Sequence, residues 1–249
     1  MKLFILLGIV LNSFIAKASF ITETDTVEAK KKQPSYHWRL TARLHSKGIF
    51  TYGGWVGSDN PTFDVNFTYE RKSWGLLVFK GFDLYDHDTF YNFSLISVFK
   101  NFKLSKRLTF TPYVGSFLEQ SNNFADSGSD LVCILITSYR LNPKMVVEYM
   151  GLFGNLVFEP EKDWVSRFRY TYTGKHLDVV STLWHNNQIF DHSSYWSAGL
   201  NIAYSRMHLS EHIMLSFGAT GIWMMHSSDP VSNPYKNTIM FTLGVMSLH

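Results

Sequence analysis

The chain has 249 residues, of which 45% are hydrophobic and 16% aromatic, and its formal net charge is only +3. Beyond the N-terminal segment, no stretch approaches the roughly 18 consecutive apolar residues of a membrane-spanning helix. A single cysteine excludes an internal disulfide framework. The small charge, without a basic patch that includes aromatic residues, argues against nucleic acid as a partner.

The N-terminus has the pattern of a secretory signal peptide. Met1-Lys2 is basic, residues 3–15 are largely apolar, and an Ala-x-Ala cleavage site ends at Ala18. We therefore expect a signal peptide over 1–18, cleaved near Ala18. Residues 19–35 contain a run of three lysines and little apolar content, which predicts a flexible periplasmic lead-in. The remaining residues, 36–249, are predicted to form one domain.

That domain consists of segments in which apolar and polar residues alternate, with turn residues between them. In residues 164–172 the aromatic residues share one phase, and Arg167 and Arg169 occupy the other. This period of two is typical of a β-strand with one face in lipid. The pattern predicts about twelve strands, centred near Thr41, Asn66, Val78, Leu95, Tyr113, Leu135, Met150, Arg169, Ser181, Leu200, Phe217 and Thr242.

The connections between these segments alternate in length. Connections after even-numbered strands are tight, as in residues 71–73 and 173–175, whereas most of those after odd-numbered strands are longer, as in 53–61 and 120–129. Short turns on one side and long loops on the other are typical of outer-membrane barrels. We therefore predict an all-β fold, a single antiparallel up-and-down transmembrane β-barrel of about twelve strands. A secreted β-sandwich or jelly roll is the soluble alternative.

Aromatic residues lie near both ends of the predicted strands, where a membrane girdle is expected. On the fourth strand, Tyr91 and Phe99 are expected to bracket Phe93, Leu95 and Ser97 on the lipid-facing side. The predicted girdle consists of Trp38, Trp74, Trp164, Tyr172, Trp196, Tyr204 and Trp223.

With this pattern the chain resembles Gram-negative outer-membrane β-barrel proteins in general. The resemblance covers everything after the signal peptide. It implies the bacterial outer membrane as the location, with its lipids and the barrel-assembly machinery as partners.

The opposite phase of the strands supplies the residues expected to face the lumen. Lys80 and Lys100 are placed there because a charge on the lipid face near mid-bilayer costs about 2–4 kcal/mol. These charges either pair across a narrow lumen or form a basic track for anionic or polar solutes. The predicted lumen set is Arg39, Arg43, Asp64, Glu70, Lys80, Lys100, Glu148, Arg167, Arg169 and Asp178.

One local motif resembles the nucleoside-specific channel family. Residues 67–74, followed by Phe82 and Asp83, are similar to the second and third strands of that family, with an acidic residue, a tight basic turn and a tryptophan. The resemblance covers under a tenth of the chain. It implies a passive channel for nucleoside-like solutes, with Glu70 and Asp83 as binding residues.

Outer-membrane barrels also include lipid hydrolases, which use a Ser-His pair. His192 and Ser194 have a His-x-Ser spacing similar to that of outer-membrane phospholipases, but the asparagine expected twelve residues later is Arg206. Solvated loop residues are the simpler interpretation, and no metal site or cofactor is expected. We predict a porin-like channel for small polar solutes. An outer-membrane lipid hydrolase of phospholipase or lipid A deacylase type, and a non-conducting structural or adhesion barrel, are the alternatives.

Overall fold

The computed structural model describes residues 36–118, 129–157, 162–187, 194–228 and 236–248. The predicted signal peptide and lead-in, most of the loop 120–129, and His192 lie outside the described residues. In the described part of the chain no helix is long and apolar enough to cross a membrane.

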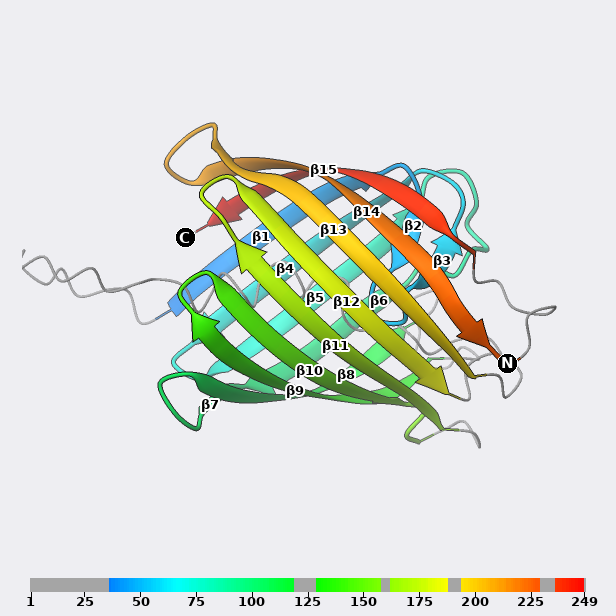
Figure 1. Cartoon of the computed structure of the whole chain (residues 1–249), viewed down its shortest axis with the longest axis horizontal. Helices are drawn as coiled ribbons and strands as arrows, with labels where there is room; N and C mark the ends of the chain where they lie inside the picture. Colours follow the sequence, from blue (N-terminus) through cyan, green and yellow to red (C-terminus); the bar gives the residue numbers. More distant parts are fainter. Residues whose placement is uncertain (1–35, 119–128, 158–161, 188–193, 229–235, 249) are drawn as a thin grey trace, which may run out of the picture.

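The described strands form a closed antiparallel barrel, in which β1 pairs with β15 and β6 pairs with β8 (Figure 1). The prediction of a twelve-stranded all-β barrel is confirmed, since β6 and β7 together make one barrel strand and all twelve predicted centres fall in barrel strands. These strands are β1 (Tyr36–His45), β4 (Thr62–Arg71), β5 (Trp74–Asp83), β6 (Ser94–Lys100) with β7 (Phe102–Lys103), β8 (Leu108–Leu118), β9 (Asp130–Asn142), β10 (Met145–Gly154), β11 (Asp163–Thr173), β12 (Leu177–Asn187), β13 (Ser194–His208), β14 (Ile213–Ser227) and β15 (Thr238–Leu248).

One end of the barrel carries the short turns. Between β4 and β5 only Lys72 and Ser73 intervene, and Lys72 takes a positive φ of 57° that closes the tight turn. The opposite end carries the longer connections, as between β1 and β4. The C-terminal end of β15 lies at the end with short turns (Figure 1). The predicted loop asymmetry is therefore present.

The outer surface of the barrel is apolar and aromatic. Trp74 is 57% exposed, and Phe168 and Phe217 are about half exposed. Water-soluble proteins rarely expose so many large apolar side chains, and such a surface is typical of contact with a membrane or another protein. All seven predicted girdle residues lie in the outward phase of their strands. Their contact with the membrane interfaces stays a prediction.

The inner face of β5 and β6 differs from the prediction. Tyr91, Phe93, Leu95, Ser97 and Phe99, expected on the lipid side, are at most 5% exposed and point inward. On this part of the wall both faces are apolar, so that alternation could not show which one faces the lumen.

Lys80 and Lys100, predicted to face the lumen, lie in the outward phase. Lys80 is opposite the outward Val65, and its ammonium lies 5.3 Å from the centre of the Phe82 ring. Lys100 is opposite Trp74 at the end with short turns and lies 4.7 Å from the centre of that indole. A long aliphatic stem lets a lysine keep its charge near an aromatic ring or the interface while its carbons contact lipid.

The connection between β1 and β4 folds into the lumen. It contains a small antiparallel hairpin, β2 (Gly48–Phe50) and β3 (Trp55–Ser58), which lies between the walls at the end opposite the C-terminus (Figure 1). Ile49, Phe50, Tyr52 and Trp55 are at most 2% exposed. We call residues 48–58 the lumen hairpin.

Candidate functional site: the lumen

The lumen hairpin packs against one half of the barrel wall through aromatic rings. Phe50 and Trp55 both contact Phe90, with ring centres 5.6 and 4.4 Å apart, and Phe90 continues the stack to Phe93. Phe93 in turn stacks on Phe117 of β8 at 5.6 Å. Burying each such ring contributes roughly 1.5–3 kcal/mol, so this stack holds the hairpin firmly to the side of β5, β6 and β8.

The turn of the hairpin is held from the other half of the wall by hydrogen bonds to its carbonyls. Trp184 of β12 donates its indole N–H to Thr51 O at 2.8 Å. Gly53 O accepts from the Asn186 amide at 2.8 Å and from the Tyr195 hydroxyl at 3.1 Å. The turn therefore reaches across the lumen to β12 and β13.

The root of the hairpin is tied to the outer loops. The carboxylate of Asp83 accepts from Ser58, from the Asn60 amide at 3.2 Å and from the Thr89 hydroxyl at 2.9 Å. At the surface, hydrogen bonds from Lys236 and Lys47 lower the pKa of Asp59 from its ordinary value. Because Lys47 precedes the hairpin and Asp59 follows it, their contact joins the two ends of the segment that enters the lumen.

Within the barrel, Asp64 is the centre of a buried polar network. Arg43 donates to both carboxylate oxygens, at 2.9 and 3.0 Å, and His45 Nε2 lies 2.7 Å from Oδ2. The Tyr91 hydroxyl donates to the same oxygen at 3.1 Å. On its other side, His45 Nδ1 is hydrogen-bonded to the Thr242 hydroxyl at 2.8 Å. The ion pair keeps this charged region electrically balanced.

A second network is centred on Glu148 of β10. Arg167 Nη2 donates to Oε1 at 2.8 Å, and Arg169 Nη2 donates to Oε2 at 2.7 Å. The Arg167 guanidinium also lies 5.3 Å from the centre of the Tyr52 ring in the lumen hairpin. Two cations share one buried carboxylate, so this group carries a net positive charge.

Eight of the ten predicted lumen charges face inward, and they are four arginines and four carboxylates. Glu70 accepts from the Asn101 amide at 2.8 Å near the end with short turns. Asp178 accepts from Ser205 on the neighbouring strand. The predicted set held six basic and four acidic side chains, and with both lysines outside, the remaining four arginines are balanced by the four carboxylates. What remains is a local positive group at Arg167 and Arg169.

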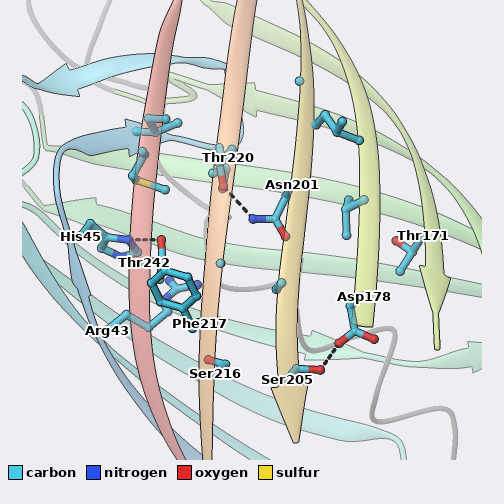
Figure 2. Close-up of a pocket in the computed structure, with 18 of the residues that line it drawn as sticks. Arg43, His45, Thr171, Asp178, Asn201, Ser205, Ser216, Phe217, Thr220 and Thr242 are labelled. Atoms are coloured by element: carbon cyan, nitrogen blue, oxygen red, sulfur yellow. Dashed lines mark hydrogen bonds between the residues drawn. The ribbon is translucent and has the colours of Figure 1, made fainter. Parts of the chain in front are cut away.

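Between the hairpin and the wall of β1 and β11–β15 lies a cavity of about 150 Å³. Figure 2 shows that its labelled polar side chains come from several strands, with Asn201 donating to Thr220 and Ser205 to Asp178. The hairpin contributes Ile49 and Thr51 to its lining. Hydroxyl groups predominate among its polar residues: Thr41, Thr51, Thr171, Thr173, Thr182, Ser205, Ser216, Thr220 and Thr242.

The two residues suggested by the resemblance to nucleoside-specific channels, Glu70 and Asp83, lie far apart. Asp83 is opposite Thr62, and Glu70 lies eight residues further along β4, about 26 Å away at ~3.3 Å per residue. Ser194 begins β13, where its backbone pairs with Ser228 in both directions. Among the described residues, no group of three or more His, Cys, Asp or Glu side chains could hold a metal ion.

Sequence reasoning missed the lumen hairpin, although a signal is present. Residues 49–56 place Phe50, Tyr52, Trp55 and Val56 around a Gly-Gly pair, far more apolar and aromatic than a solvated loop. Two apolar runs separated by glycines predict a β-hairpin that needs a core to cover it. In a barrel, that core is the lumen.

Comparison with known proteins identifies the architecture. No protein-family model matches the chain, and no curated protein matches its sequence. Among solved structures, a KdgM porin superposes with a TM-score of 0.56 at 9% identity, over 84% of this chain and 98% of that one. A structure of the KdgM porin in complex with disordered oligogalacturonate gives 0.53 at 7% identity, over 85% and 98%.

Two further channels are similar to the same extent. The NanC porin has a TM-score of 0.53 at 13% identity, over 84% of this chain and 98% of that one. The COG4313 outer membrane channel from Pseudomonas putida F1 has 0.53 at 10% identity, over 91% and 100%. The chain thus has the fold of outer-membrane β-barrel channel proteins.

Proposed function

We propose that the protein is an outer-membrane channel for the passive diffusion of small polar solutes. The observation that carries this proposal is a closed barrel whose lumen hairpin leaves a cavity with hydroxyl-bearing walls beside it instead of filling the whole cross-section. A barrel of about eight strands is filled by its own side chains, and one of 16–18 encloses a wide aqueous channel. Twelve strands leave room for an inserted hairpin and a narrow path.

The outward apolar surface supports the membrane part of this proposal. Exposed aromatic and aliphatic side chains surround the barrel, while the ion pairs of Asp64 and Glu148 lie inside it. Signal-peptide cleavage near Ala18 and assembly by the barrel-assembly machinery complete the proposed route to the outer membrane.

The selectivity of the path depends on its local charges. Arg167 and Arg169 exceed their shared carboxylate by one charge, which supports a mild preference for anions. Arg169→Gln leaves the Arg167–Glu148 pair balanced and should shift the reversal potential in a salt gradient towards zero. Lys80→Gln removes the same charge from the outward face and should leave it unchanged; equal shifts for both variants would contradict the assignment.

The packed half of the lumen favours one competing function, a non-conducting structural barrel, because the ring stack from Trp55 to Phe117 closes that side. Reconstitution of the folded protein in planar bilayers separates the two. A channel gives discrete current steps, whereas the absence of current from correctly folded protein supports the plugged barrel. Lipid hydrolysis that disappears in Ser194→Ala would instead support the enzyme alternative.

A further inference from the structure

The cavity beside the lumen hairpin combines apolar and hydroxyl-bearing walls. Ile49 of the hairpin, Trp184 of β12 and Met240 of β15 form one buried apolar cluster, and all three line the cavity. Hydroxyls of β1, β11, β14 and β15 supply most of the polar lining, and Asn201 adds an amide (Figure 2). Ligand sites in proteins are commonly apolar surfaces with a few converging polar groups.

Threonine is the commonest polar residue of the cavity lining. The hairpin and several wall strands contribute it, including Thr51, Thr171, Thr182 and Thr220. A threonine side chain offers a hydroxyl that can both donate and accept a hydrogen bond, with a methyl group beside it. A lining of this kind suits a ligand whose own polar groups are hydroxyls.

The charged groups of the lining do not favour an ionic ligand. Arg43 already binds Asp64 through two nitrogens, and both ring nitrogens of His45 are engaged by Asp64 and Thr242. Asp178, at the far side, is a carboxylate that accepts from Ser205. The groups that remain to bind a ligand are neutral hydroxyls and amides.

The cavity suits a single ring. It measures about 150 Å³ and is partly open, so one six-membered ring can lie in it while its substituents extend towards the opening. A ring that offers a C–H face to Trp184 and Ile49 and hydroxyl groups at its edge would match both walls.

From this arrangement we propose that the cavity is a binding site for one neutral polyhydroxylated ring, a monosaccharide-sized sugar or cyclic polyol. This inference deepens the proposed channel function, in which the solute would pause at the site during passage. Its chemistry differs from that of the positive group at Arg167 and Arg169, because the site selects hydroxyls and not a carboxylate.

The test uses the purified full chain in detergent micelles with D-glucose and D-glucuronate as probes, because they differ only in a hydroxymethyl group against a carboxylate. Isothermal titration calorimetry should show D-glucose binding at least about tenfold more tightly than D-glucuronate. Thr182→Val removes a hydroxyl from a half-buried residue of the cavity lining and keeps the shape of the side chain, so it should weaken glucose binding by about fivefold without impairing folding.

A pair of methionine substitutions provides the steric control. Ala203→Met places a long side chain in the cavity and should abolish binding, whereas Ala198→Met adds the same side chain to the outward face of β13 and should not. Absence of glucose binding to the wild type, equal binding of both probes, or equal loss in both methionine variants would overturn the inference. Bilayer conductance of the same preparations reports separately on the channel: current without glucose binding refutes only the site, and binding without current refutes only the channel.

Discussion

Glu148→Gln should be among the most destabilising single changes that preserve side-chain shape. Glu148 is 2% exposed and is the acceptor for both Arg167 and Arg169. The substitution removes the only negative charge that these two guanidinium groups share in the described network. They stand two residues apart on β11, about 7 Å at ~3.3 Å per residue. At an effective dielectric constant of about 20, their repulsion amounts to about 2 kcal/mol.

The glutamine amide keeps one acceptor oxygen but turns an NH2 donor towards the other guanidinium, which adds to that repulsion. Breaking a buried ion pair typically costs about 3–5 kcal/mol in all. The assay is urea-induced unfolding in phospholipid vesicles, followed by tryptophan fluorescence. The matched control is Arg169→Gln, which should stay within about 1 kcal/mol of wild type, since relief of the repulsion offsets the lost hydrogen bond. If Glu148→Gln unfolds like wild type, or if Arg169→Gln is equally destabilising, the shared-carboxylate arrangement is wrong.

Two further predictions concern the lumen hairpin. Gly54 has a φ of +70°, and a Cβ there would lie within 2.5 Å of Trp184, so Gly54→Ala should lower the free energy of unfolding by at least about 1–3 kcal/mol in the same assay. Gly57→Ala is the milder control, because its Cβ would meet Phe90 at 3.2 Å. Equal effects of the two substitutions would argue against the tight fit of the turn. The pKa of Asp59 is lowered, above all by the hydrogen bond from Lys236, so this contact is complete above the ordinary carboxyl pKa of 3.8 and is lost as the pH falls through the lower folded value. In the wild type, hydrogen exchange at the hairpin root should therefore increase only in that acidic range. In Asp59→Asn, exchange should already be higher at neutral pH and should not change in the acidic range. A wild-type profile without an increase in the acidic range would contradict the proposed role of the Asp59 contacts.

The strand count and direction follow from sequence because they rest on strict alternation. In β11, Arg167 and Arg169 alternate with Trp164 and Phe168, and no other phase avoids placing the arginines in lipid. The same logic failed on β5, where Leu76 and Val78 face outward and Leu77 and Phe79 face inward.

The reason for that failure is the lumen hairpin. Its rings need an apolar inner wall, and this removes the polar phase from β5, β6 and β8. With both phases apolar, the phase of Lys80 and Lys100 was decided by the cost of a charge in lipid, and this argument placed both lysines on the wrong side of the wall.

The candidate site was predictable in its charges but not in its pairing. The phase of each strand put Arg43, Asp64, Glu148 and both β11 arginines in the lumen, as found. The pairing of each arginine with a carboxylate depends on the register between strands. The existence of the cavity depends on where the loop between β1 and β4 folds. Neither is encoded in the alternation of a single strand.

The most direct test of the account is the single-channel conductance of two proteins in planar bilayers. One is the wild type, and the other has residues 47–60 replaced by a short Gly-Ser linker that leaves every barrel strand intact. If the hairpin narrows a real channel, the wild type gives small current steps and the shortened protein gives steps several-fold larger. Steps of equal size, or no current from either folded protein, would contradict the account.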